Sequence, residues 1–372
     1  MDKYQLTKMK ITLIAGARPN FIKIAPIIEA IENAKAMGKS IDYRLVHTGQ
    51  HYDKNMSESF FDQLGIPQPH ANLECGGGTQ SEQTANIMVR FEKELFAHPT
   101  NLVLVVGDVT STMACSIVAK KLCIPVAHIE AGIRSGDMSM PEEINRIVTD
   151  SITDYFFTTT EIAGQNLKKL GVVESKIFFV GNTMIDTLLK NKPLFQKPQI
   201  WDNAKLKEKN YFVLTLHRPA NVDEENNLKL LMLEIIQAAR NLPIIFPVHP
   251  RTAKNLNAIG VHADNLYMID PLSYLEFNYL VQNAKAVITD SGGITEETTI
   301  MRVPCITLRN NTERPETITI GTNELIGTDP KLVKPTVDKI FKGEWKKGGI
   351  PELWDGKTAE RIVVHLLKLT QS

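Results

Sequence analysis

The sequence lacks long hydrophobic runs, an excess of either charge and paired cysteine motifs, and each absence excludes a class of protein. No apolar stretch approaches the roughly 20 residues of a membrane-spanning helix. The 42 basic and 42 acidic side chains balance, which gives no electrostatic reason to expect nucleic acid or an anionic membrane as a partner. Residues 1–10 lack the apolar core of a signal peptide.

Neither the cysteines nor the spacing of potential metal-binding residues indicates a cofactor. The four cysteines, at positions 75, 115, 123 and 305, show no Cys-x-x-Cys spacing. This is typical of buried thiols in a reducing cytosol, so we expect a soluble, cytoplasmic protein. No spacing of His, Cys, Asp and Glu resembles a zinc site. No Gly-x-Gly-x-x-Gly follows the first apolar run, which argues against a nicotinamide nucleotide. We expect neither a metal nor a cofactor.

Short apolar runs alternate with amphipathic stretches along the chain. An apolar run at 10–15 leads through a turn to a helical stretch that continues to residue 31, and the runs at 102–106 and 126–129 flank another helix. Strands alternating with helices indicate a parallel sheet covered on both faces. The pattern restarts at 211, and residues 286–308 repeat the order of 102–129. We therefore predict an α/β protein with two Rossmann-like parallel-sheet domains.

The domain boundaries follow from composition. We expect an N-terminal domain over residues 1–189 and a linker over 190–209, a stretch rich in Lys, Pro and Asn. A C-terminal domain, expected to bind a nucleotide, follows over 210–355. A last helix lies within 356–372 and could pack back on the N-terminal domain. Because ligands of parallel sheets bind beyond the carboxyl ends of the strands, the polar turns of the two domains could face each other across a cleft.

The stretch 286–299 is the clearest candidate for binding. An apolar strand turns through residues 290–293 (Asp-Ser-Gly-Gly) into a helix, which leaves backbone N–H groups and a helix dipole available for a phosphate. Glu296 and Glu297 follow, and one of them could accept hydrogen bonds from ribose hydroxyls. An ordinary tight turn, with the glutamates favouring the helix N-terminus, fits the same residues.

Three carboxylates are placed for acid–base chemistry. Asp108 and Glu130 each follow an apolar strand, and Glu142 begins a helix. Such groups can shift one another's pKa values and so provide a separate acid and base. Arg146 lies four residues after Glu142 and shares its helix face, so a surface ion pair is the alternative. Glu143 is expected to be a solvated neighbour.

Cations and histidines occupy other strand ends. Arg18 and Lys23 follow the first strand, where they could reach the cleft or be ordinary surface cations. His217 and His249 end or follow strands of the second domain. Histidine at such places can donate to a phosphate or relay a proton.

Nine motifs, in this order over about residues 9–330, resemble the UDP-N-acetylglucosamine 2-epimerase family. They are Gly16-Ala17-Arg18-Pro19, Thr48-Gly49-Gln50-His51, Gly107-Asp108, His128-Ile129-Glu130-Ala131-Gly132, Pro141-Glu142-Glu143-x-Asn145-Arg146, Gly181-Asn182-Thr183-x-Ile185-Asp186, His217-Arg218, Asp290-Ser291-Gly292-Gly293-x-x-Glu296-Glu297 and Thr312-Glu313-Arg314-Pro315-Glu316. The chain departs from the family pattern at Ala17 and Asn20, where the family often has Thr and Glu.

The resemblance implies a GT-B-like fold with a UDP-sugar between the domains, no cofactor, and a homodimer. It implies these roles: Asp108, Glu130, Glu142 and His217 in catalysis; Ser291, Gly292, Gly293 and Arg18 on the diphosphate, with help from His217; Glu297 on the ribose; Leu272 and Phe277 beside the uracil; Arg314, Lys23 and Arg146 lining the substrate site.

The implied reaction inverts C2 of UDP-GlcNAc to give UDP-ManNAc. The C2 proton is not next to a carbonyl, so UDP would leave C1 as that proton leaves C2, and both would then be added back. Donors on the diphosphate would stabilise the leaving group. The alternatives are a hydrolysing epimerase that releases ManNAc, an epimerase of a UDP-diacetamido-uronic acid, a GT-B glycosyltransferase, and a nucleotide-sugar binding module without turnover.

Overall fold

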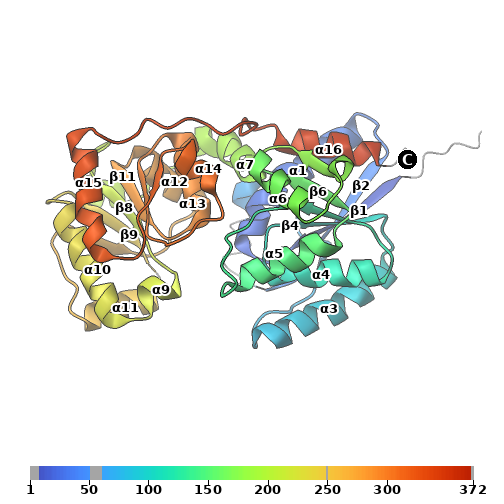
Figure 1. Ribbon diagram of the computed structural model, residues 1–372, viewed down its shortest axis with the longest axis horizontal. Helices are drawn as coiled ribbons and strands as arrows, with labels where there is room; N and C mark the ends of the chain where they lie inside the picture. The colour runs from blue at the N-terminus through green and yellow to red at the C-terminus, as the bar shows by residue number, and fades with distance from the viewer. Residues whose placement is uncertain (1–7, 51–60, 249, 370–372) are drawn as a thin grey trace, which may run out of the picture. The chain divides into compact units, whose positions relative to one another are not determined.

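The computed structural model describes residues 8–50, 61–248 and 250–369. Within them the chain divides into two compact units. Unit 1 comprises the residues up to Lys190 together with those from Glu352 onward, and unit 2 comprises Asn191–Pro351. Each unit is a parallel sheet with helices on its faces (Figure 1). The predicted α/β fold with two parallel-sheet domains is confirmed.

Unit 1 contains a seven-stranded sheet in the order β3-β2-β1-β4-β5-β6-β7. Its strands are β1 (Met9–Ala15), β2 (Ile41–His47), β3 (Ala71–Asn72), β4 (Leu102–Val106), β5 (Val126–Ile129), β6 (Tyr155–Thr158) and β7 (Ile177–Phe179). All five residues of β4 are buried, as expected for a central parallel strand covered on both faces. Because the strand order reverses beside β1, the crevice beyond the ends of β1 and β4 is where a ligand is expected.

The helices of unit 1 connect these strands. They are α1 (Arg18–Ala36), α3 (Gln80–Ala97), α4 (Thr110–Lys121), α5 (Pro141–Ile152), α6 (Glu161–Lys169), η1 (Glu174–Lys176), α7 (Thr183–Asn191) and α16 (Thr358–Lys368). Pro19 lies in the first turn of α1 and Pro141 in that of α5, where the missing N–H is no loss. Helices therefore begin directly after the strand ends that carry the polar turns.

Unit 2 contains a six-stranded sheet in the order β10-β9-β8-β11-β12-β13. Its strands are β8 (Phe212–Thr215), β9 (Ile244–Pro247), β10 (Leu266–Ile269), β11 (Ala286–Thr289), β12 (Cys305–Thr307) and β13 (Asn323–Leu325). Its helices are η2 (Lys192–Leu194), α8 (Ile200–Asn203), α9 (Pro219–Val222), α10 (Glu225–Ala238), α11 (Pro250–Ala258), α12 (Tyr274–Asn283), α13 (Gly292–Met301), α14 (Pro315–Thr319), η3 (Pro330–Leu332) and α15 (Val333–Lys342). Here β8 and β11 are the central pair, and the turns after both lie at one edge.

Residues 190–209, for which composition predicted a linker, carry short helices and contribute to the core of unit 2. Ala204 and Leu206 are buried with Tyr211 in the cluster against α12. The lysines that suggested a linker, Lys192 and Lys197 among them, are exposed. A few buried apolar residues are enough to pack this stretch against the core of unit 2. The many polar residues around them make this apolar pattern hard to recognise in the sequence.

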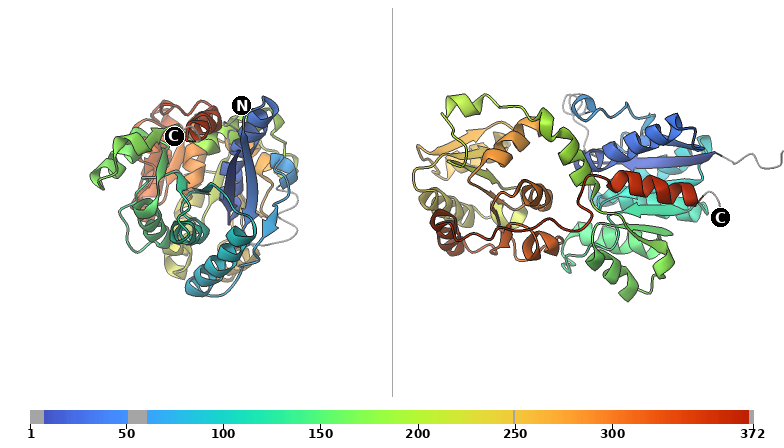
Figure 2. Two further views of the ribbon diagram at one scale, coloured as in Figure 1. Left: turned by 90° about the vertical axis from the view of Figure 1, so that its right-hand side faces the viewer. Right: turned by 90° about the horizontal axis from the view of Figure 1, so that it is seen from above.

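The C-terminal helix α16 belongs to unit 1 and packs beside α1 (Figure 2). Asp186 on α7 caps its first turn by accepting hydrogen bonds from the N–H groups of Thr358 (3.1 Å) and Ala359 (2.7 Å). Trp354, just before the helix, is 2% exposed, and its indole N–H donates to the carbonyl of Thr159. Among the described residues no helix is long and apolar enough to cross a membrane.

The cap residue Asp186 makes the stability of unit 1 depend on pH. Burial raises the pKa of Asp186 from 3.8 to about 6. Between these values the folded chain keeps a proton that the unfolded chain releases, so the free energy of unfolding falls as the pH rises from about 4 to 6, by on the order of 3 kcal/mol for this group. In Asp186→Asn this dependence should be absent. Unfolding midpoints at pH 4 to 7 test it, and a constant difference between the two proteins would contradict it.

Candidate functional site

The carboxyl ends of β1, β4 and β5 bring three polar turns together in unit 1. Because β4 pairs with both β1 and β5, the turns that begin at Gly16, Gly107 and Glu130 are neighbours. Glu130 has φ of +69° and Gly107 has φ of +68°. Non-glycine residues rarely adopt this left-handed conformation, and they cluster at functional sites when they do.

Lys23 of α1 and Glu130 form a buried ion pair. Lys23 Nζ lies 2.7 Å from Glu130 Oε2, and the two side chains are 9% and 2% exposed. A Cβ at Gly107 would lie 3.2 Å from Lys23 Nζ, so the close approach and the positive φ both favour glycine there. Two residues that the sequence assigned to the site are thus in direct contact, although 107 positions separate them.

Asn20 fixes the turn after β1. Its Oδ1 accepts hydrogen bonds from the N–H groups of Gly16 (3.1 Å) and Ala17 (3.0 Å), and its Nδ2 donates to the carbonyl of Val106 (3.0 Å). Glutamate, which the family often has at this position, could not make that last donation. Sequence analysis noted the departure and assigned no role to Asn20.

Asp108 is paired with Arg146 of α5. Arg146 Nη2 and Nε lie 2.5 and 3.1 Å from Asp108 Oδ2, and Asn145 donates to the Asp108 carbonyl. Arg146 Nη1 also lies 2.7 Å from Glu143 Oε2. The arginine side chain is 3% exposed, so it is no surface cation. It links a strand-end carboxylate to the helix that carries Glu142.

The expectation for Glu142 and Glu143 was wrong in one respect: Glu143 is the buried residue and Glu142 is exposed. Glu143 accepts hydrogen bonds from the N–H groups of Ser135 (2.9 Å) and Gly136 (3.1 Å). Burial disfavours its charged form, but the Ser135 N–H and the Arg146 guanidinium outweigh this and hold the pKa of Glu143 below its usual value. Arg146 pairs across three residues with Glu143, a spacing as compatible with a helix as the four to Glu142.

His128 and Asp150 form a buried support beneath these turns that sequence analysis did not identify. His128 Nδ1 lies 2.7 Å from Asp150 Oδ1, and His128 Nε2 lies 2.8 Å from the Gly107 carbonyl oxygen. Both ring nitrogens of His128 are thus within hydrogen-bond distance of an oxygen atom. Asp150 also pairs with Arg134 at 2.7 Å. Burial opposes ionisation of Asp150, but His128 and then Arg134 hold its pKa below the usual value.

In unit 2, Asp290 joins the turns after β8 and β11. Its carboxylate accepts hydrogen bonds from the N–H groups of His217 (3.0 Å) and Arg218 (2.9 Å) and from Asn221 Nδ2 (3.0 Å). His217 Nδ1 lies 2.7 Å from Asp290 Oδ1, with the histidine side chain 60% exposed and the aspartate fully buried. Burial opposes ionisation of Asp290, but His217 and the other donors hold its pKa below the usual value. The buried Asp290 carboxylate therefore orients the imidazole of His217, while most of the imidazole surface is exposed to solvent.

The N-terminus of α13 follows Asp290 directly. Ser291 is the N-cap residue and makes no side-chain cap, so the first-turn N–H groups at Gly292 and Gly293 are not capped by it. A Cβ at Gly292 would lie 3.0 Å from Glu313 Oε1, which favours glycine. Glu313 pairs with Arg309 at 2.6 Å. The N–H groups of this helix start could bind an anion, and the Arg309–Glu313 ion pair lies beside them.

Glu296 and Glu297 have different surroundings. Glu296 and Arg314 form a buried ion pair at 2.5 Å, with side chains 1% and 7% exposed. Glu297 is 3% exposed and lies 3.5 Å from Asn278 Nδ2. Burial, and then the neighbouring Glu297, raise the pKa of Tyr274. Glu296 therefore holds Arg314, and the role of Glu297 on the ribose stays a prediction.

The remaining predicted site residues lie on helices or directly before one. Arg18 begins α1 and is half-buried, and Leu272 and Phe277 are half-buried against the core cluster beside α12. His249 lies outside the described residues. Within those residues no group of three or more His, Cys, Asp and Glu side chains could hold a metal ion.

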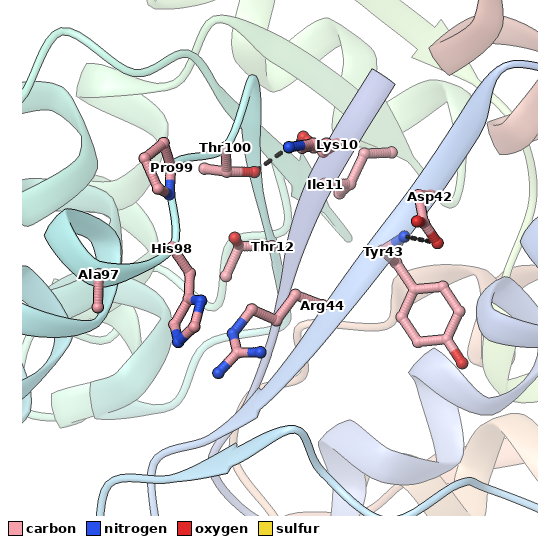
Figure 3. A pocket seen from close by; sticks show the side chains of 10 residues that line it. All are labelled: Lys10, Ile11, Thr12, Asp42, Tyr43, Arg44, Ala97, His98, Pro99 and Thr100. Carbon is pink, nitrogen blue, oxygen red and sulfur yellow. Dashed lines mark hydrogen bonds between the residues drawn. The ribbon is translucent and has the colours of Figure 1, made fainter. Parts of the chain in front are cut away.

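Two of the hollows on unit 1 are lined by described residues. One lies at the amino ends of β1 and β2, the edge opposite the polar turns, and contains none of the predicted site residues (Figure 3). Its lining is Lys10, Ile11, Thr12, Asp42, Tyr43, Arg44, Ala97, His98, Pro99 and Thr100. The other lies among α3, α4 and the start of α5, and Asn145 is part of its lining.

The different environments of Glu142 and Glu143 lead to a test with a matched pair. Glu143→Gln breaks a buried ion pair with Arg146 and should lower the free energy of unfolding by about 3 kcal/mol. Glu142→Gln changes an exposed side chain and should alter it by less than about 0.5 kcal/mol. Denaturant unfolding of both variants measures this, and equal stability of the two would contradict the assignment.

The model of the UDP-N-acetylglucosamine 2-epimerase family matches residues 34–367. The UDP-N-acetylglucosamine 2-epimerase of Methanocaldococcus jannaschii is 43% identical over 368 residues, 95% of this chain and 98% of that protein. A UDP-2,3-diacetamido-2,3-dideoxy-D-glucuronate 2-epimerase of Pseudomonas aeruginosa is 38% identical over 97% of this chain and 100% of that protein.

Solved structures agree with the fold. The M. jannaschii UDP-GlcNAc 2-epimerase in complex with UDP-GlcNAc and UDP superposes with a TM-score of 0.87 at 42% identity, covering 97% of this chain and 100% of that one. The Neisseria meningitidis UDP-GlcNAc 2-epimerase bound to UDP-GlcNAc gives a TM-score of 0.88 at 29% identity, with the same coverage. The GT-B-like fold expected from the motifs is confirmed, and the chain belongs to the UDP-N-acetylglucosamine 2-epimerase family, a family of isomerases.

Proposed function

We propose that the protein interconverts UDP-GlcNAc and UDP-ManNAc by inverting C2, through elimination and re-addition of UDP. The observation that carries the proposal is the pair of carboxylate–cation contacts at one sheet edge, Lys23 with Glu130 and Arg146 with Asp108. These residues come from four separate parts of the chain. The names of the family members support the substrate.

The surroundings of the three carboxylates suit separate acid and base roles. The side chain of Glu130 is 2% exposed and pairs with Lys23, whereas that of Asp108 is 26% exposed and pairs with Arg146. Glu142 is exposed. Because the three carboxylates lie on separate turns, one could remove the C2 proton while another returns a proton to the opposite face.

Unit 2 would hold the nucleotide. The N-terminus of α13, with Ser291, Gly292 and Gly293, supplies N–H donors for the diphosphate, and His217 is held by Asp290 beside it. Glu297 would accept the ribose hydroxyls, while Leu272 and Phe277 flank the uracil. Donors fixed before the reaction stabilise the charge that develops on UDP as it leaves C1.

The sugar is the least constrained part of the proposal. The 38% identical relative from P. aeruginosa acts, by its name, on a diacetamido-glucuronate nucleotide, so that sugar is the second candidate. Incubation with each nucleotide sugar in deuterated water, followed by NMR, tests both. Epimerisation with deuterium at C2 and no net release of UDP supports the proposal for that sugar. Stoichiometric UDP with free ManNAc indicates the hydrolysing reaction, and an absence of C2 exchange with either sugar contradicts epimerisation.

We further propose that the protein works as a cytoplasmic homodimer. The second hollow is lined on α3, α4 and α5 by Met88, Met113 and Ile144, and Ile144 is 45% exposed. Val89 on α3 is 55% exposed. Such a surface is suited to an interface. Sedimentation velocity should show a dimer, and Val89→Asp should shift it toward monomer; a wild-type monomer at all concentrations would rule the dimer out.

The carboxylates give a direct test of the mechanism. Asp108→Asn, Glu130→Gln and Glu142→Gln each remove a proton carrier and should lower kcat by about a hundredfold or more. Turnover of UDP-GlcNAc and C2 exchange are measured for each variant, with circular dichroism as the control for folding. Wild-type turnover in all three folded variants would overturn the assignment.

A further inference from the structure

Residues 181–186 form the sixth of the nine motifs, and sequence analysis assigned them no role. Together with Thr187, they indicate a structural role. Two of these residues lie side by side on α7. Asp186 caps α16, as described above. Thr187 is 1% exposed, and its side chain contacts helix α1.

Helix α1 contains a proline in its interior, Pro26. Proline has no N–H, so the carbonyl of Ile22, four residues earlier, loses the donor that an α-helix would supply. Ile22 is 8% exposed, and a buried carbonyl needs a partner. Pro26 therefore removes the backbone donor that would ordinarily serve the Ile22 carbonyl.

Thr187 meets that requirement. Its hydroxyl donates to the Ile22 carbonyl oxygen at 2.6 Å, across 165 positions of the chain. A second contact between α7 and α1, Lys190 Nζ with Glu29 at 2.7 Å, is exposed and contributes little. The buried hydroxyl thus links this turn of α1 to α7.

The residue after Ile22 is Lys23, whose ammonium group lies against Glu130. Pairing at 2.7 Å inside a buried site depends on where the backbone of α1 places the lysine. We propose that Thr187 is a positioning residue for the Lys23–Glu130 pair: its hydroxyl replaces the donor that Pro26 removes and so holds the turn that carries Lys23. This role rests on the proposed function, since it is expressed through turnover.

The test uses variants that remove, keep or restore the donor. Thr187→Val keeps the shape and removes the hydroxyl, and it should lower kcat by about tenfold to a hundredfold with KM for UDP-GlcNAc little changed. Thr187→Ser keeps the donor and should retain turnover. Pro26→Ala restores the backbone N–H, so the double variant Pro26→Ala/Thr187→Val should recover most of the lost kcat.

Thr322→Val is the matched control for the loss of a buried hydroxyl. Thr322 is 2% exposed and donates to the Val303 carbonyl at 2.8 Å within unit 2. Thr322→Val should lower the melting temperature without the fall in kcat that is expected for Thr187→Val. A folded Thr187→Val with wild-type kcat overturns the proposal. If Thr187→Val does not fold, the double variant decides, because recovered turnover supports the role and absent turnover refutes it.

Failure of the positioning role is separable from failure of the proposed function. If the wild-type protein epimerises and Thr187→Val does so equally well, only the positioning role falls. If the wild-type protein shows no C2 exchange, the proposed function falls, and a crystal structure of Thr187→Val still tests the contact: the proposal requires a displaced Lys23–Glu130 pair, and an unchanged pair refutes it.

Discussion

The buried ion pair of Lys23 and Glu130 places demands on much of unit 1. Two charges removed from water are destabilising unless they are held in contact. Holding them requires a glutamate in a left-handed conformation and a glycine at position 107, where a side chain would crowd the ammonium group. His128 and Asp150 then fix the Gly107 carbonyl from below. The turns at Gly107 and Glu130 thus both support the Lys23–Glu130 ion pair.

Unit 2 uses a buried carboxylate differently. The side chain of Asp290 is fully buried. Asp290 directly follows β11 and accepts hydrogen bonds from N–H groups in the turn after β8. The acid thereby fixes two loops and orients His217, whose ring is largely exposed. Unit 1 and unit 2 thus each depend on a buried acid that holds other polar groups in place around it.

Parts of the candidate site could be predicted from the sequence because they follow strands. Asp108 and Glu130 follow the ends of β4 and β5, and the turn at 290–293 leads into a helix, as expected. The choice between Glu142 and Glu143 was not accessible in this way, because spacings of three and four are both compatible with pairing to Arg146. Only the loop at residues 135–136, whose N–H groups bind Glu143, decides which glutamate turns inward.

By itself the sequence determined the alternation of strands and helices, its repetition in a second domain and the motifs of the family, since these are local patterns of spacing and residue type. The tertiary structure alone decided which groups meet. Lys23 finds Glu130, Asn20 finds Val106, and Thr187 finds the carbonyl that Pro26 leaves without a donor. Such pairings depend on strand order and helix packing, and the residues involved are separated by so much of the chain that no local periodicity records them.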